Sequence, residues 1–251
     1  MCMSGEKSPI GDLEGIIIRS QGCKLLGTLY RTRGSGRSPA AVLLHGFPGF
    51  EKNYDIAQAL RQLGYHALIF HYRGAWGSEG NYTFTGQIDD TLSALKVLRS
   101  RPDVDPDKIL LVGHSMGSWL AINVGAIDKR IAGVVAISGI GDARRFKLDR
   151  GRADRSLQFL KGMTFEDYVE ERQILAEKHN PVEKIGMISA RPVLIIHGDS
   201  DAVVEVKNAY ELYEAAREPK EIFVVSGADH VFSYQRQEVI DRIISWIEKI
   251  S

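Results

Sequence analysis

The sequence predicts an α/β fold in which a mostly parallel sheet is covered by helices. Short apolar runs typical of buried strands alternate along the chain with segments whose apolar residues recur at helical spacing. Such an alternation requires parallel strands that are joined by right-handed crossovers. One apolar run also leads directly into Gly-x-Ser-x-Gly at residues 113–117, a pattern that belongs to a strand–turn–helix unit.

Eight strands are expected along the chain, and the first two form an antiparallel pair. Residues 15–19 and 24–31 make up this pair because only a short segment around Gln21-Gly22 separates them. The later strands are expected at 40–44, 66–70, 109–112, 131–138, 192–198 and 221–225. Apolar residues at helical spacing occur between strands at 56–63 and 88–98, and at 240–250 they mark a last helix after the final strand.

Ser115 is the candidate nucleophile. A serine reacts only when a base takes its proton and its oxygen stands clear of the backbone. The flanking glycines, Gly113 and Gly117, remove the side chains that would clash in a sharp turn from strand to helix. Ser115 is therefore expected at the carboxyl end of its strand, where its hydroxyl is exposed.

The acid that would orient the base is expected after the serine, and Asp201 is the preferred candidate. The run 192–197 predicts a buried strand that ends at Gly198 and leads into a polar loop. A carboxylate there lies at the edge where open α/β sheets bind ligands. Asp199 competes for the role, but its simpler interpretation is a turn residue that bonds to nearby backbone.

His230 is the candidate base. It lies in the loop after the expected strand at 221–225, downstream of both Ser115 and Asp201, which is the order this turn family uses. The other histidines have simpler roles. His45, His114 and His197 each adjoin a glycine, and we expect them to hold loop backbone by hydrogen bonds.

Two backbone N–H groups are candidates for an oxyanion hole. The Gly/Pro-rich loop at 45–49 follows the expected strand at 40–44, and Phe47 is its expected donor because Pro48 has no N–H. Met116, the residue after the nucleophile, is expected to supply the second donor.

With these motifs the chain resembles the α/β-hydrolase superfamily, and most closely its small esterases and serine-aminopeptidase-like members. The resemblance rests on five segments in family order, at residues 45–49, 72–78, 113–117, 197–201 and 227–230. It implies an eight-stranded, mostly parallel sheet with helices on both faces. It also implies a catalytic triad of Ser115, Asp201 and His230. The single glycine before Phe47 departs from the Gly-Gly-Gly run of many lipases, which disfavours bulky tertiary alcohol esters.

Residues 142–190 interrupt the alternation, and we expect a small helical lid there. The segment has no strand signal and is too long for a plain connection. Thr164 and Asp167 predict a capped helix that ends before Pro181. Tentative pocket residues are the aromatic side chains Phe146, Phe159, Phe165 and Tyr168. Basic residues at 144–161 could bind an anion, although a solvated helix face explains them more simply.

Composition narrows the function classes. The chain of 251 residues is 44% apolar, which suits a single domain over residues 1–251. Equal numbers of basic and acidic residues, 32 of each, argue against nucleic-acid binding. The first residues lack the apolar core of a signal peptide, and no run is long enough to span a membrane. A cytoplasmic protein without metal or other cofactor is expected, and the formation of a homo-oligomer stays open.

The sequence therefore predicts a serine hydrolase that cleaves carboxylic esters of small to medium size through an acyl-enzyme. A serine peptidase, aminopeptidase or amidase with the same triad is the alternative. A peptidase should offer an acidic anchor for the substrate amine, for which the lid carboxylates at 166–171 are candidates. A binding protein without catalysis is less favoured, because all four catalytic parts are present.

Overall fold

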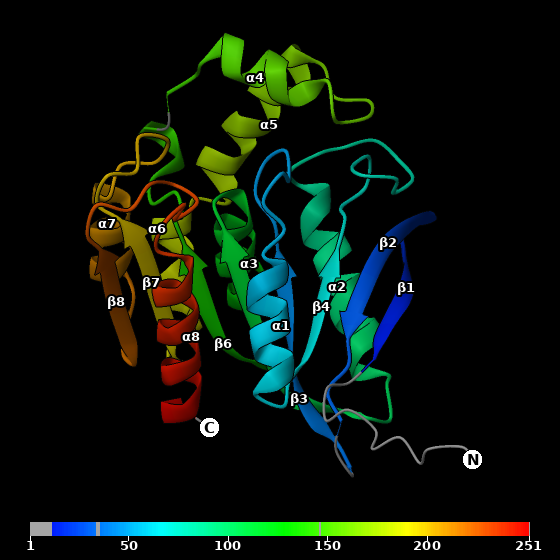
Figure 1. The fold of residues 1–251 in the computed structure, drawn as a ribbon. Helices are drawn as coiled ribbons and strands as arrows, with labels where there is room; N and C mark the ends of the chain where they lie inside the picture. Colours follow the sequence, from blue (N-terminus) through cyan, green and yellow to red (C-terminus); the bar gives the residue numbers. More distant parts are fainter. Residues whose placement is uncertain (1–11, 34–35, 146, 251) are drawn as a thin grey trace.

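The structure, a computed structural model, describes residues 12–33, 36–145 and 147–250. Within these residues the chain forms one eight-stranded sheet in the order β1-β2-β4-β3-β5-β6-β7-β8 (Figure 1). The strands are β1 (Leu13–Ser20), β2 (Cys23–Tyr30), β3 (Ser38–Leu44), β4 (His66–Phe70), β5 (Val104–His114), β6 (Ile131–Ile137), β7 (Val193–Gly198) and β8 (Lys220–Val225).

Among these eight strands, β2 is the one that runs in the direction opposite to all the others. It pairs antiparallel with β1 and with β4, whereas every pair from β4 to β8 is parallel. Gln21 and Gly22 join β1 to β2 with φ of 46° and 84°, the left-handed backbone that a tight hairpin needs. The predicted fold class, a mostly parallel eight-stranded sheet with an antiparallel first pair, is confirmed.

Helices cover both faces of the sheet. On one face α1 (Tyr54–Gln62) and α8 (Arg236–Ile250) pack against alternate strand residues such as Ala41 and Leu43. On the other, α2 (Gly86–Arg99), α3 (Met116–Ile127) and α7 (Lys207–Ala215) pack against the intervening residues, among them Val42 and Leu44. This division follows from the strand period of two, which sends neighbouring side chains to opposite faces. Both sides of the central strands are thus buried.

The strand that carries Ser115 is longer than expected. β5 begins at Val104 rather than at Ile109, and its register against β3 shifts between Ser38 and Ala40. Residues 105–108, Asp-Pro-Asp-Lys, are at least partly exposed and carry no apolar strand pattern. Val104 pairs with Ser38 of β3, a contact between distant parts of the chain that sequence periodicity does not reveal.

The segment between β6 and β7 contains the predicted lid helices. They are α4 (Arg150–Leu157) and α5 (Phe165–Lys178), followed by the short α6 (Pro181–Lys184). Figure 1 shows α4 and α5 beyond the carboxyl ends of the parallel strands. The capping box of α5 forms as expected, because Thr164 and Asp167 each bond the backbone N–H of the other. None of the helices in the described part of the chain is long and apolar enough to span a bilayer.

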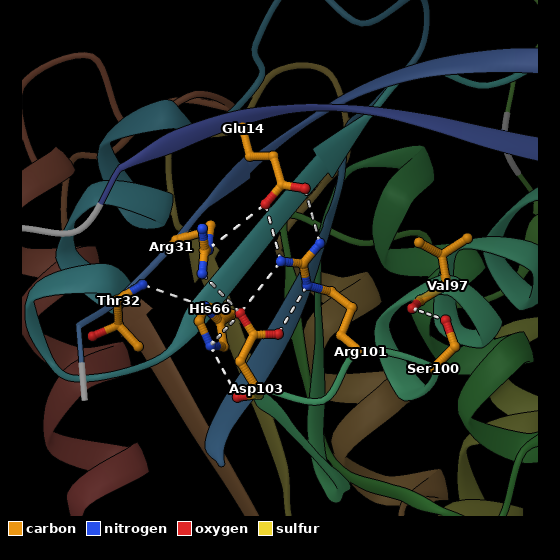
Figure 2. Close-up of polar contacts among 8 residues, drawn as sticks. All are labelled: Glu14, Arg31, Thr32, His66, Val97, Ser100, Arg101 and Asp103. Carbon is orange, nitrogen blue, oxygen red and sulfur yellow. Dashed lines mark hydrogen bonds and ion pairs between the residues drawn. The ribbon is translucent and has the colours of Figure 1, made fainter. Parts of the chain in front are cut away.

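An ion-pair network joins the first strands at the opposite end of the sheet (Figure 2). Arg101 donates to both carboxylate oxygens of Glu14 on β1, at 3.0 and 2.9 Å, and to Asp103 at 3.0 Å. Arg31 at the end of β2 donates to Asp103 at 3.2 Å. Two-oxygen contacts of this kind hold the guanidinium plane in one orientation. The network therefore fastens the antiparallel strands to the parallel part of the sheet.

Arg101→Ala should lower the free energy of unfolding by about 1–2 kcal/mol, because it removes several charge-assisted hydrogen bonds from a partly buried site. Burial raises the pKa of Asp103, but the hydrogen bonds from Arg101 outweigh it and lower that pKa. A lowered carboxyl pKa stabilises the fold above the ordinary value of about 4, and this contribution disappears as the pH falls further. The difference in urea midpoint between wild type and variant should therefore shrink below pH 4. Arg130→Ala, which removes an exposed arginine, should change the midpoint little.

Candidate active site

Ser115 occupies a strained turn between β5 and α3. Its backbone angles, φ of 57° and ψ of −118°, lie in a region that residues other than glycine rarely adopt. A Cβ atom on Gly113 would lie 2.0 Å from the carbonyl oxygen of Gly117, and one on Gly117 would lie 1.9 Å from that of Leu44. The two glycines therefore allow β5, α3 and the end of β3 to approach one another closely. Their role in the motif is to make this packing sterically feasible.

Ser115, His230 and Asp201 form a continuous chain of hydrogen bonds. The Nε2 atom of His230 lies 3.0 Å from the Ser115 Oγ, and its Nδ1 atom lies 2.7 Å from Oδ2 of Asp201. The three residues follow β5, β7 and β8, whose parallel arrangement places these ends at one edge of the sheet. The structure thus brings together side chains that are 29 to 115 positions apart in sequence.

Asp201 is held as a buried carboxylate. Its Oδ1 atom accepts the backbone N–H groups of Val203 and Val204 at 2.8 and 2.9 Å. Burial raises the pKa of Asp201, but hydrogen bonds from His197 and His230 prevail and hold it well below its usual range. The side chain is therefore ionised at neutral pH and can accept the Nδ1 proton of His230.

Asp199 has a different role from Asp201. Its Oδ1 atom accepts the backbone N–H of Gly227 at 2.7 Å and the hydroxyl of Ser200 at 3.1 Å. It thereby joins the loop after β7 to the loop after β8. This is the backbone-binding turn role that the sequence suggested for it.

Three other histidines bind loop carbonyls, as expected. His114 lies 2.8 Å from the carbonyl oxygen of His230, His45 bonds that of Gly46, and His197 bonds that of Val204. Burial lowers the pKa of His114 to about 3, so its ring is neutral at neutral pH. A neutral ring can hold the loop that carries His230 without placing a second positive charge beside it.

Met116 directly follows Ser115 in the chain, and Phe47 lies in the loop after β3. A Cβ atom on Gly46 would be only 3.0 Å from the Cβ of Ser115, which shows how closely the loop after β3 passes the serine. Among the described residues, neither the Phe47 nor the Met116 N–H has a hydrogen-bond acceptor. Both residues line the cavity that opens at Ser115. Their N–H groups are therefore available to an oxygen bound there.

A cavity of about 560 Å³ lies over the serine. The lid contributes Phe159 and Tyr168, both of which the sequence indicated as pocket residues. Tyr168 stacks on Phe47 with ring centroids 5.5 Å apart and meets Phe84 at 5.8 Å. The lining is formed by Phe47, Pro48, Phe50, Phe84, Ser115, Met116, Ile140, Ala143, Arg152, Ala153, Arg155, Ser156, Gln158, Phe159, Tyr168, Arg172, Leu175, Val203 and His230.

The other two aromatic residues expected in the pocket are Phe165 and Phe146. Phe165 is not among the residues that line the cavity, which corrects that expectation. The Arg150 guanidinium lies 4.1 Å from its ring centre, and its ring packs 6.2 Å from that of Tyr168, outside the cavity wall. Phe146 lies outside the described residues.

Several residues of the cavity wall were not predicted from the sequence. Phe50 and Phe84 come from loops after β3 and β4, and Ile140 and Val203 come from loops after β6 and β7. Nothing local distinguishes them from ordinary loop apolar residues. Their position after strands that end at the same sheet edge was the one available signal. Within the described residues, no cluster of three or more metal-binding side chains occurs.

Tyr168→Ala should shift the preference between long- and short-chain esters by about tenfold to a hundredfold. The buried ring forms part of the apolar wall, and a large side chain against substrate contributes about 1.5–3 kcal/mol. The measurement is the ratio of kcat/KM for an octanoate and an acetate ester of one alcohol. Val169→Ala, on an exposed part of the same helix, is the control and should leave the ratio unchanged. An unchanged ratio in Tyr168→Ala would show that this lid residue does not influence the choice of substrate.

Comparisons with known proteins indicate the family of this chain. Residues 41–242 match the sequence profile described as the alpha/beta hydrolase family. The uncharacterized protein YfhR of Escherichia coli K12 is 26% identical over 215 residues, covering 80% of this chain and 68% of YfhR. The uncharacterized peptidase YtmA of Bacillus subtilis is 28% identical over 241 residues, covering 91% and 90% of the two chains.

A similar fold is seen in Est1E from Butyrivibrio proteoclasticus, whose structure was solved with ferulic acid bound. The two share 18% sequence identity with a TM-score of 0.78, over 93% of this chain and 98% of Est1E. Identity at this level speaks for the fold alone. The profile match, in contrast, extends over most of the sequence, from the strand before the Gly/Pro-rich loop to the last helix. The chain therefore belongs to the α/β-hydrolase family.

Proposed function

We propose that this hydrolase cleaves carboxylic esters of small to medium size, with Ser115 as nucleophile, His230 as general base and Asp201 as the residue that orients the base. The observation that carries the proposal is the hydrogen-bonded chain from Ser115 through His230 to Asp201, with distances of 3.0 and 2.7 Å. That chain ends in a cavity whose wall is largely aromatic and aliphatic. A reactive serine and an apolar wall suit an ester with a hydrocarbon portion.

In this proposal the Ser115 Oγ attacks the ester carbonyl carbon while its proton moves to Nε2 of His230. The carbonyl oxygen becomes an oxyanion, which accepts hydrogen bonds from the N–H groups of Phe47 and Met116. Collapse of this intermediate breaks the bond to the alcohol oxygen, which takes the proton from Nε2. Water then attacks the acyl-serine by the same route, giving the carboxylic acid and restoring Ser115.

The comparisons leave a peptidase as the second candidate, since YtmA is named as one. A peptidase that trims amino termini needs a negative group to bind the substrate amine. The lid carboxylates do not supply one to this cavity, because Asp167 caps α5 and Glu171 accepts the N–H and hydroxyl of Thr85. No Asp or Glu lines the cavity in the described part of the chain. The charge of the wall therefore favours esters over amino-terminal peptides.

A substrate panel distinguishes the two candidates. p-Nitrophenyl esters from acetate to octanoate should be hydrolysed, and p-nitroanilides of amino acids should react at least a hundredfold more slowly. Chelators should have no effect on ester turnover, because the proposed steps use only side chains and backbone. Turnover confined to the anilides would refute the ester proposal and support a peptidase.

A further inference from the structure

The basic residues of the lid do not all lie on a solvated face. Arg144 and Arg145 form ion pairs with Asp142, and each also reaches a second carboxylate, Glu183 or Glu211. These two arginines are therefore neutralised in place. The simpler interpretation, a mixed and solvated surface, fits this part of the cluster.

Arg152 and Arg155 on α4 differ from this group. Both line the cavity above Ser115, and Arg172 on α5 lines it as well. Within the described residues, no ion pair joins Arg152 or Arg155 to a carboxylate. Asp154 pairs instead with Arg150, at 3.3 Å. Three arginines thus line the cavity and, among the described residues, no acid does.

Asp149 is an acid close to Arg152, and it serves another purpose. Asp149 caps α4 by accepting the backbone N–H of Arg152 at 2.9 Å. Its side chain lines a second hollow of about 480 Å³ rather than the cavity above Ser115. Arg152, Tyr168 and Val203 line both spaces. Asp149 therefore adds no carboxylate to the lining of the first cavity, although its charge acts on Tyr168.

Tyr168 independently places two of these arginines close to the apolar wall. Arg172 lies 5.5 Å from the centre of its ring. Burial raises the pKa of the Tyr168 hydroxyl, the charges of Arg172 and Arg152 lower it, and the charge of Asp149 raises it. Both guanidinium groups are thus near the aromatic surface on which a substrate would lie.

We propose that this cavity selects esters that carry a carboxylate at the end of their acyl chain, bound by Arg152 and Arg155 with support from Arg172. The inference rests on the proposed ester hydrolysis at Ser115 and narrows its substrate class. A guanidinium binds a carboxylate through two parallel hydrogen bonds, and the contact gains strength where aromatic groups exclude water. The apolar wall would hold the methylene chain between the ester and the carboxylate.

Matched substrate pairs test the proposal. We would compare the p-nitrophenyl half-esters of adipate and suberate with p-nitrophenyl hexanoate and octanoate, which have the same chain length without the charge. In wild type, kcat/KM should favour the half-ester at least tenfold for one of the two lengths. Arg152→Gln/Arg155→Gln should reduce that ratio to about one, and 1 M NaCl should reduce it in wild type. The ratio is measured within each protein, so a loss of folded enzyme cancels.

Arg150→Gln is the control, because it removes the same charge from the same helix at a residue paired with Asp154 and outside the cavity lining. It should keep the wild-type ratio. A wild-type ratio of one or less at both lengths, or an unchanged ratio in the double variant, would overturn the proposal.

Calorimetric binding to Ser115→Ala separates this inference from the proposed function. Monomethyl adipate should bind at least tenfold more tightly than methyl hexanoate, and the two arginine substitutions should abolish that difference. Equal binding of the two compounds would refute the anion site whatever the turnover experiments show. Tighter binding of the half-ester without turnover of any ester would support the site and refute the proposed reaction.

Discussion

Ser115→Ala is expected to lower kcat for p-nitrophenyl esters by about 10⁶, the usual effect of removing a nucleophilic serine that acts with a histidine. The variant loses the oxygen that lies 3.0 Å from the Nε2 atom of His230. It keeps the backbone N–H groups of the turn and the cavity wall, so substrate binding should remain. Labelling by a fluorophosphonate, followed by mass spectrometry of the modified peptide, should disappear together with turnover.

Ser118→Ala provides the control for this experiment. Ser118 lies one turn further along α3, fully buried, and its Oγ has no hydrogen-bond partner among the described residues. Its loss should leave both labelling and turnover near wild type. Labelling that persists at another serine in Ser115→Ala would contradict the assignment of the nucleophile.

Asp201→Asn is expected to lower kcat by about 10⁴, because an amide in place of the carboxylate favours the wrong imidazole tautomer. The carboxylate accepts from Nδ1 of His230 at 2.7 Å, which leaves Nε2 free to take the serine proton. The amide oxygen of asparagine can still accept the N–H groups of Val203 and Val204. The fold should therefore persist, which circular dichroism and the thermal midpoint would check.

Asp199→Asn is the matched control, two residues away and with the same chemical change. Its carboxylate binds backbone and Ser200 but not His230. An amide oxygen can replace its contact with Gly227, so kcat should change less than tenfold. If Asp199→Asn proved the more damaging substitution, Asp201 would not be the residue that orients the base.

The fold could be predicted because its signals are local. The sequences of β3 and β4 are nearly continuous apolar runs, because both faces of these strands are buried. In α8 the apolar residues recur at helical spacing, because only one face of this helix packs against the sheet. The hairpin of β1 and β2 was indicated by Gln21-Gly22 in a short connection. The start of β5 could not be predicted, because residues 105–108 carry no apolar pattern and Val104 pairs with Ser38, which is far away in the sequence.

The candidate site was predictable for a related reason. Ser115, Asp201 and His230 each follow a recognisable strand, and parallel strands bring their carboxyl ends to one edge of the sheet. Chain order and strand position were therefore enough to select these residues. The sequence could not show that their side chains are within hydrogen-bond distance, since that depends on the strand order and on the loops around them.

By itself, then, the sequence determined the class of fold, the strained serine turn and the three residues that meet at the sheet edge. Only the tertiary structure decided the wall of the cavity: it placed Tyr168 against Phe47 and left Phe165 out of the lining. It also separated Arg152 and Arg155, which face the cavity, from lid arginines that are neutralised by ion pairs. Backbone periodicity and turn chemistry are local properties of the chain. The surroundings of a lid side chain depend instead on which distant loops pack against it, and no local pattern records that.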